Sequence, residues 1–172
     1  MNGQNKCSNG KRLPPHDIMP LPIEFAERID KKTIENKCDF APKFGDDGLI
    51  PVVAQDHKSG EILMVAYMNR ESLQKTITLK EAVYFSRSRN KLWHKGETSG
   101  NVQKVTEMRT DCDQDVILMK VEQVGPGCCH VGYRSCFYRK VDLADKIAAP
   151  DDSHIVQLEF SAEKTYNPDE VY

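Results

Sequence analysis

The chain has 172 residues, with 39% hydrophobic and 29% charged side chains and a formal net charge of −2. This length suits one domain with tails, and the near balance of charge gives no general attraction to nucleic acid or to anionic membranes, so we expect neither as a partner. No apolar run approaches the ~20 residues that cross a bilayer, and the N-terminus lacks the apolar core of a secretory signal, so the expected location is cytoplasmic.

Residues 1–44 are rich in Pro, Lys, Asn and Asp, and we interpret them as an N-terminal extension with a short helix within Leu21–Ile34. The domain, expected over residues 45–142, begins with two apolar, β-branched runs, Leu49–Gln55 and Ile62–Tyr67. The turn-forming residues HKSG separate these runs, and this pattern predicts a β-hairpin.

The clearest helix spans Asn69–Lys80, with Asn69 as its N-cap and an apolar side that includes Leu73 and Ile77. Further strands are expected at Ala82–Ser86, Val102–Met108, Val116–Val121 and Ser135–Val141. Residues 143–172 form an acidic C-terminal tail, expected to pack on the domain, with a strand-like piece at Ile155–Phe160. Many strands with one or two helices predict an α+β fold with a mainly antiparallel sheet.

The six cysteines are unevenly distributed, because Cys112, Cys128, Cys129 and Cys136 fall within one short stretch. Cytoplasmic thiols are normally reduced, so clustered cysteines there indicate a metal site or catalysis before disulfides. Catalytic zinc sites carry three protein ligands and an open position, and three thiolates from this cluster satisfy that count. The competing interpretation is a set of buried free cysteines, which are common in protein cores.

Three carboxylates alternate in the motif DCDQD, at Asp111, Asp113 and Asp115. On an extended strand they would line one face and Cys112 the other. Carboxylates crowded in this way favour a hard cation such as Mg²⁺, although a solvated acidic loop fits the pattern equally well. The opposite orientation of Cys112 means either a bulge or a zinc site completed by Cys112 of a second copy.

The stretch SRSRNKLWHKGETSGN, residues 86–101, combines Arg, Lys and hydroxyl side chains around one tryptophan. Arg and Lys beside Gly-flanked hydroxyls suit a phosphate group, and Trp93 is placed to stack on a base. A solvated basic loop is the alternative. His130 follows Cys129 directly, so a fourth-ligand, general-base or structural-donor role is open to it.

Taken together, SRSRNKLWHKGETSGN, VQKVTEMRTDCDQD and GCCHVGYRSCF resemble the phosphoribosyl-AMP cyclohydrolase family over about Gly45 to Val141. The resemblance implies an intertwined homodimer with zinc sites shared between subunits. It implies zinc ligation by Cys112, Cys129 and Cys136, with Cys112 from the partner subunit, and Mg²⁺ ligation by Asp111, Asp113 and Asp115. Cys128 departs from the family pattern and is not counted as a ligand.

The activity implied by the resemblance is hydrolysis of the adenine ring of 1-(5-phosphoribosyl)-AMP between N1 and C6, in L-histidine biosynthesis. The product is the ring-opened formimino aminoimidazole carboxamide ribonucleotide. Zinc lowers the pKa of a bound water, and His130 is the expected proton-transfer group. The expected substrate contacts are Arg87, Trp93, Lys95, Glu97, Thr98 and Ser99. The tail after Val141 is too short for the second hydrolase domain of many relatives, so one activity is expected.

Three other functions remain open from the sequence. A zinc nucleobase deaminase would share the chemistry but would release ammonia, and its HxE and PCxxC signature is missing. A structural zinc that only holds a dimer together would leave no turnover to lose on chelation. A redox role for Cys128 and Cys129 is disfavoured because adjacent cysteines rarely form an unstrained disulfide.

Overall fold

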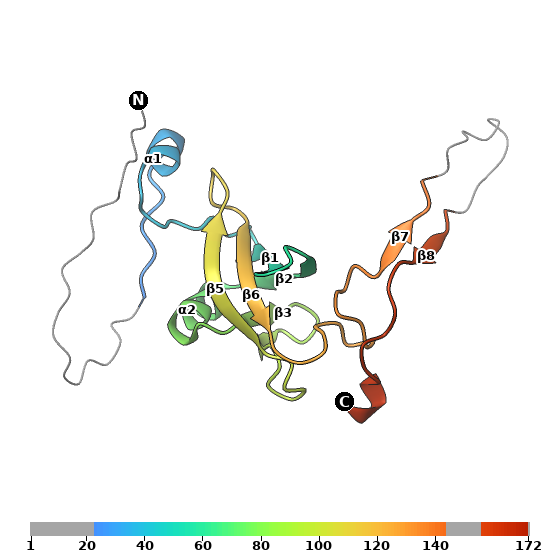
Figure 1. Cartoon of the computed structure of the whole chain (residues 1–172). Helices are drawn as coiled ribbons and strands as arrows, with labels where there is room; N and C mark the ends of the chain where they lie inside the picture. The colour runs from blue at the N-terminus through green and yellow to red at the C-terminus, as the bar shows by residue number, and fades with distance from the viewer. Residues whose placement is uncertain (1–22, 144–155, 172) are drawn as a thin grey trace.

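The computed structural model describes residues 23–143 and 156–171, and Figure 1 shows a curved sheet with the helix α2 beside it and an arm that projects from it. Its elements are α1 (Lys31–Asn36), β1 (Ile50–Asp56), β2 (Ile62–Met68), α2 (Arg70–Leu79), β3 (Val83–Ser86), β4 (Lys91–His94), β5 (Gln103–Thr110), β6 (Ile117–Gln123), β7 (Arg139–Val141), β8 (Leu158–Phe160) and a 3₁₀ turn at Pro168–Glu170. No helix within these described ranges is long and apolar enough to cross a membrane.

The central sheet has the strand order β2-β1-β6-β5. β1 and β2 form the expected hairpin, in which Val52 lies opposite Ala66, and β5 and β6 form a second antiparallel pair. β1 and β6 run parallel, with Val52 opposite Ile117. The α+β class and the mainly antiparallel sheet are therefore confirmed, with one parallel pair at the centre of the sheet.

The predicted helix is confirmed as α2, because Asn69 caps it. The Asn69 side chain accepts a hydrogen bond from Ser72 N, and the Ser72 hydroxyl accepts one from Asn69 N, each at 2.8 Å. Thr76 then joins α2 to β3, since its hydroxyl accepts from Val83 N at 3.0 Å. Leu73, on the inner face of this helix, is fully buried.

The hydrophobic core lies between the central sheet, α2 and β3. Most of its members are apolar side chains at alternate positions of the strands, which point to the buried face of the sheet. Cys128, from a later loop, packs with them. The buried residues are Ile50, Val52, Ala54, Leu63, Met64, Met68, Leu73, Ala82, Tyr84, Ile117, Met119, Val121 and Cys128. Tyr84 is satisfied within this core because its hydroxyl donates to Gln103 Oε1 at 2.7 Å.

Several sequence-based boundaries are wrong. The N-terminal helix forms at Lys31–Asn36 rather than over Leu21–Ile34, of which Leu21 and Pro22 lie outside the described residues. Residues 86–101 are not only a polar stretch, because they contain β4, which pairs with β3. The strand expected at Ser135–Val141 is reduced to the three residues of β7.

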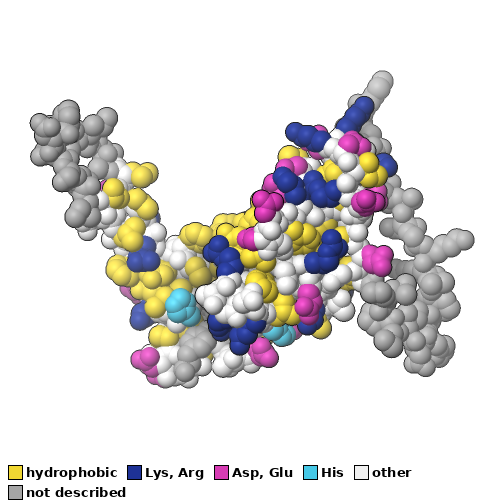
Figure 2. Space-filling model, turned by 180° about the vertical axis from the view of Figure 1, so that it is seen from behind, with side chains coloured by type: hydrophobic (Ala, Val, Ile, Leu, Met, Phe, Trp, Pro, Cys, Tyr) yellow, Lys and Arg dark blue, Asp and Glu magenta, His cyan; other side chains and the backbone are white. Residues whose placement is uncertain are grey.

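The arm consists of β7 and β8, which form a two-stranded ribbon separate from the central sheet. Every residue of both strands is exposed. Figure 2 shows hydrophobic side chains on this projecting part, and the exposed apolar residues there include Val141, Leu158 and Phe160. The ribbon corresponds to part of the expected strand Ile155–Phe160, of which Ile155 lies outside the described residues.

Candidate active site

The motif DCDQD lies in the turn between β5 and β6, not on a strand, so the predicted alternation of Cys112 and the aspartates is wrong. Asp111 organises this turn, because its Oδ1 accepts from Asp115 N at 3.0 Å and from Val116 N at 3.2 Å. Gln114 adopts a positive φ of 60°, which ends the strand geometry. Cys112 is exposed at the tip of the turn.

The three aspartates do gather, since one carboxylate oxygen from each lies within 4.8 Å of the others. The ammonium of Lys43 sits against two of them, 3.1 Å from Asp115 Oδ2 and 3.5 Å from Asp113 Oδ2. Its hydrogen bond to Asp115 raises the pKa of Lys43. Burial acts to raise the pKa of Asp113, but the charge and the hydrogen bond of Lys43, together with hydrogen bonds inside the turn, outweigh it and leave that pKa below its usual value. The Lys43 ammonium therefore offsets part of the repulsion among the three carboxylates, a role for which the sequence predicts a metal ion.

The segment before β1 holds this turn in place. The Gln114 side chain accepts from Ala41 N at 2.7 Å and donates to Asp39 O at 3.2 Å, and Lys43 N donates to Gln114 O at 2.7 Å. Arg28 donates to Asp113 O at 2.9 Å. Residues of the predicted N-terminal extension thus contact the aspartate turn directly.

The other three clustered cysteines lie on a loop that we call the cysteine loop, residues 124–138. Two backbone hydrogen bonds close it, from Cys128 N to Arg134 O at 3.0 Å and from Cys129 N to Tyr133 O at 3.1 Å. Gly127 is required here, because a Cβ at this position would lie 2.5 Å from Tyr133 O. The loop brings the thiol of Cys136 next to those of Cys128 and Cys129.

The three thiols influence one another strongly. A hydrogen bond with Cys136 lowers the pKa of Cys128, and the same contact, together with burial, raises the pKa of Cys136. Burial also raises the pKa of Cys129. The three thiols thus favour one thiolate and disfavour a second and a third. A bound divalent cation would relieve this, because it stabilises several thiolates at once.

Lys95 adds a buried positive charge to this region. It is 1% exposed, and its Nζ donates to Asn101 O at 3.1 Å. Burial lowers the pKa of Lys95, while the thiol groups of Cys128, Cys136 and Cys129 act in the opposite direction. An ammonium enclosed beside thiols favours their ionised form.

A cavity of about 410 Å³ joins β4 and the residues after it to the cysteine loop. Its walls include Trp93, Lys95, Glu97, Thr98 and Ser99, all expected from the sequence to contact substrate, together with His130 from the cysteine loop. Arg89 and Lys91, which the sequence interpretation did not select, also line it. The cavity therefore carries three cationic side chains and two histidines, His94 and His130, a lining that suits an anionic ligand.

Arg87 lies elsewhere, with its guanidinium 4.0 Å from the centre of the Tyr67 ring. A larger cavity of about 600 Å³ lies on the α2 side of β4 and shares Leu92, His94 and Glu97 with the first. It is lined by Glu71 and Glu97, and the one lysine in its wall, Lys75, is paired with Glu71 at 2.9 Å. This lining is less suited to a phosphate, so the smaller cavity is the better candidate site.

Cys112 is separated from the other cysteines within one chain. Cys136 N donates to Leu63 O at 2.7 Å, which places the cysteine loop at the outer strand β2, whereas Cys112 follows the opposite outer strand, β5. Strands lie about 4.8 Å apart, so these edges are more than 10 Å apart, roughly, whereas two thiolates on one zinc lie within about 4 Å. One chain does not bring Cys112 to Cys129 and Cys136.

The C-terminal tail covers the outside of the cysteine loop. The Tyr166 hydroxyl donates to Cys129 O, and Thr165 N donates to Gly132 O at 2.7 Å. The rings of Tyr133 and Tyr138 stack with centroids 3.8 Å apart, and Phe160 of β8 lies 6.5 Å from Tyr133. The tail thereby supports the backbone next to Cys129.

Comparison with known proteins agrees with these motifs. The model of the phosphoribosyl-AMP cyclohydrolase family matches residues 64–138. A phosphoribosyl-AMP cyclohydrolase of Rhodopseudomonas palustris is 50% identical over 139 residues, which are 81% of this chain and 88% of that protein. One of Bradyrhizobium diazoefficiens is 53% identical over 140 residues, 81% of this chain and 94% of that protein. The chain belongs to the phosphoribosyl-AMP cyclohydrolase family.

A further relative, the phosphoribosyl-AMP cyclohydrolase of Chlorobium phaeovibrioides, is 49% identical over 146 residues, 85% of this chain and 94% of that protein. Membership in the phosphoribosyl-AMP cyclohydrolase family makes this chain an enzyme. The span matched by the family model, from β2 to Tyr138, contains the aspartate turn, the smaller cavity and the cysteine loop.

Proposed function

We propose that this chain hydrolyses 1-(5-phosphoribosyl)-AMP at the N1–C6 bond of the adenine ring, a step of L-histidine biosynthesis. The observation that carries this proposal is the cavity in which the residues after β4 face His130, beside buried thiols. Its size suits part of a nucleotide, and its cations Arg89, Lys91 and Lys95 suit phosphate groups. The names of the relatives supply the substrate.

Each side chain around the cavity has a role in this proposal. Trp93 offers a ring face beside the adenine, with the Arg89 guanidinium 5.9 Å from the ring centre. Glu97, Thr98 and Ser99 offer oxygen atoms to ribose hydroxyls and ring nitrogens. His130 is exposed on the cavity wall, where its imidazole would move a proton between water and the ring nitrogen.

The thiols fit zinc by the chemistry of their donor set. Cys129 and Cys136 of one copy, with Cys112 of a second copy, would hold zinc with one position open. When bound, zinc supplies a water of lowered pKa as the nucleophile. Cys129 rather than Cys128 is the proposed ligand, since the Cys128 sulfur lies 3.2 Å from Leu63 O and belongs to the hydrophobic core. Lys95 offsets the negative charge of the thiolates.

The aspartate turn fits Mg²⁺ by the same criterion, with three carboxylates within reach of one ion. Asp111, Asp113 and Asp115 would hold it, and the ion would supply positive charge for a substrate phosphate. Lys43 would then have to leave its two carboxylates.

A homodimer follows from the same proposal. Cys112 is exposed and remote from the cysteine loop of its own chain, so a zinc site that combines Cys112 with Cys129 and Cys136 needs a second copy. Exposed apolar residues on the β7–β8 ribbon, at 54% for Val141 and 70% for Phe160, are surface that such a dimer would bury. A symmetric dimer of this kind contains two equal sites.

The test is an absorbance assay of ring opening with 1-(5-phosphoribosyl)-AMP, performed on the purified protein, after chelation and after addition of zinc. We expect turnover, its loss on chelation and its return with zinc, without release of ammonia. Ammonia release would identify a deaminase instead. Absence of turnover in the zinc-loaded protein would overturn the proposed function.

A further inference from the structure

We propose that Arg134 is a positioning residue, whose guanidinium, held by Asp56 and Glu61, fixes the backbone that presents Cys129 and Cys136 to zinc. This inference rests on the proposed function, because it concerns the same zinc site. It starts from the fact that residues 124–138, all within the described part of the chain, form no helix or strand. Such a loop needs anchors from outside itself to hold ligands at fixed positions.

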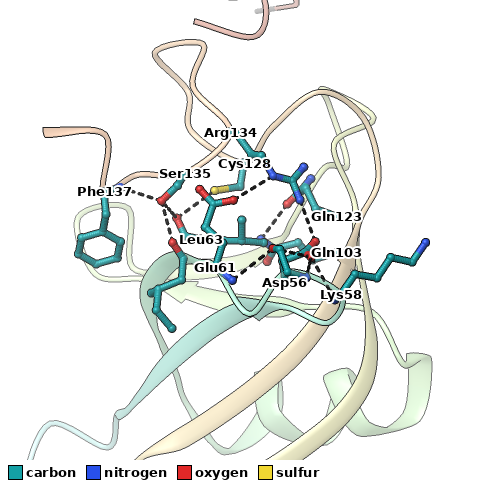
Figure 3. A network of polar contacts seen from close by, with 12 residues as sticks. Asp56, Lys58, Glu61, Leu63, Gln103, Gln123, Cys128, Arg134, Ser135 and Phe137 are labelled. Carbon is teal, nitrogen blue, oxygen red and sulfur yellow. Dashed lines mark hydrogen bonds and ion pairs between the residues drawn. The ribbon is translucent and has the colours of Figure 1, made fainter. Parts of the chain in front are cut away.

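The first anchor is a forked ion pair, seen in Figure 3. Arg134 Nη2 lies 2.9 Å from Asp56 Oδ2, and Arg134 Nε lies 3.0 Å from Glu61 Oε2. The Asp56 side chain is 8% exposed, so its charge is poorly hydrated and depends on this partner. Both carboxylates flank the turn between β1 and β2, and the guanidinium therefore ties the loop to the central sheet.

Asp56 is itself rigidly held. Its second oxygen, Oδ1, accepts from Lys58 N at 3.1 Å, from Ser59 N at 2.8 Å and from the Ser59 hydroxyl at 2.9 Å. The carboxylate thus cannot follow the arginine if the loop moves. The ion pair fixes the position of Arg134 relative to β1 rather than simply adding a flexible contact.

The backbone next to Arg134 transmits this position to the cysteines. Arg134 O accepts from Cys128 N at 3.0 Å, and two residues later Cys136 N donates to Leu63 O at 2.7 Å. Between them the Ser135 hydroxyl donates to Ile62 O at 2.7 Å and accepts from Phe137 N at 2.9 Å. The backbone of Arg134 is therefore bonded to Cys128, next to Cys129, and it also lies two residues before Cys136.

Arg134 does not line either of the two cavities beside β4, so it acts through the backbone and not on the substrate. Loss of the guanidinium would leave the buried Asp56 without its counter-charge and free residues 128–136 to shift. Zinc–thiolate distances tolerate only about 0.2 Å of change, so a small shift weakens the site. Partners that orient metal ligands typically contribute about 10- to 100-fold in metal affinity.

The experiment measures zinc affinity of the full-length protein by competition with a chromophoric chelator, together with the thiolate-to-cobalt absorption bands of the Co²⁺ form. We expect Arg134→Gln to bind zinc about 10- to 100-fold more weakly and to show weakened or shifted bands. Arg134→Lys, which keeps the charge but not the fork, should recover part of the affinity. Asp56→Asn should weaken binding too, and Asp56→Asn with Arg134→Gln should cost less than the sum.

A matched control is Arg139→Gln, because Arg139 lies over the Tyr138 ring at 5.0 Å and has no part in the fork. It should leave affinity and bands unchanged. If Arg134→Gln does not fold, the same zinc affinity and cobalt bands are measured on Glu61→Gln. The Glu61 side chain is half-exposed and is paired with Arg134 Nε, so its loss should be tolerated by the fold. Unchanged affinity and bands in folded Arg134 or Glu61 variants would overturn this inference alone. Absence of thiolate bands in the wild type would overturn the proposed zinc site as well.

Discussion

The adjacent thiols of Cys128 and Cys129 lie in different surroundings, and this difference leads to a prediction. The Cys128 sulfur contacts Leu63 O and core side chains, and a serine there keeps a hydroxyl donor for the same carbonyl. We expect Cys128→Ser to retain most zinc and turnover. Cys129→Ser should lose both. Zinc per chain by mass spectrometry and the ring-opening assay measure the two effects, and a loss confined to Cys128→Ser would reverse the ligand choice.

Lys43 occupies the position that a divalent cation would share with Asp113 and Asp115. Its pKa is raised by Asp115, so it stays charged at neutral pH and competes with the metal. We therefore expect Lys43→Gln to bind Mn²⁺, a spectroscopic substitute for Mg²⁺, several-fold more tightly in an electron paramagnetic resonance titration. Lys104→Gln, at an exposed position of β5, is the control. Equal or weaker binding by Lys43→Gln would contradict the competition.

Sequence motifs reveal residues that line the candidate site more readily than residues that hold the site in position. Local motifs predict functional roles for His130, Trp93 and Lys95, and the fold brings these residues to one cavity or beside the thiols. The partners of Arg134 and Lys43 lie far away in sequence, Asp56 by 78 positions and Asp113 by 70. No local pattern encodes such pairs. Arg134 lies within the motif GCCHVGYRSCF, but nothing in that motif distinguishes it from an exposed arginine.

At the scale of elements, the turn between β1 and β2 depends on an ionised carboxylate. Backbone hydrogen bonds from Ser59, with further help from Arg134, hold the pKa of Asp56 below its ordinary value of 3.8. The folded state thus favours the ionised form, and its stabilisation is complete above pH 3.8 and is lost as the pH falls through the lower, folded-state pKa.

The corresponding variant is Asp56→Asn. We expect it to reduce the free energy of unfolding by about 1–2 kcal/mol at neutral pH, because charge-assisted hydrogen bonds are lost while Arg134 keeps access to water. The difference from wild type should shrink in acid, below the pKa of Asp56. Urea unfolding at several pH values measures this, with the exposed Asp46→Asn as control. A difference that stays constant with pH would rule out ionisation as its source.

Regular elements followed from the sequence where apolar side chains alternate, as in the hairpin of β1 and β2. They did not follow where tertiary contacts decide the backbone. The residues before β7 look like a strand, yet Ser135 and Cys136 bond to the carbonyls of Ile62 and Leu63 instead of to a ladder. Similarly, DCDQD alternates like a strand, but the Gln114 side chain bonds to the segment before β1 and the motif turns.

At the scale of the whole molecule, exposed features gather on parts that one copy leaves uncovered. A two-stranded ribbon is marginally stable alone in water, and β7–β8 has three-residue strands and exposed apolar side chains. The tip that carries Cys112 is likewise exposed. The proposed dimer accounts for both, since one contact would bury the apolar surface and the other would complete a thiolate set. The distance of Cys112 from the cysteine loop, and not strand parity, therefore supports its assignment to a second copy.

Complementation between inactive variants tests this arrangement. Neither Cys112→Ser nor Cys129→Ser should turn over substrate alone, but a mixed dimer keeps one intact site, made from Cys112 of one copy and Cys129 and Cys136 of the other. Random reassociation of equal amounts should restore about a quarter of the wild-type activity, because half of the symmetric dimers are mixed and each has one of two sites. Cys129→Ser mixed with Cys136→Ser should restore nothing, since both changes damage the same group of ligands. Equal recovery in both mixtures, or none in the first despite mixed dimers seen by native mass spectrometry, would place Cys112 outside the zinc site.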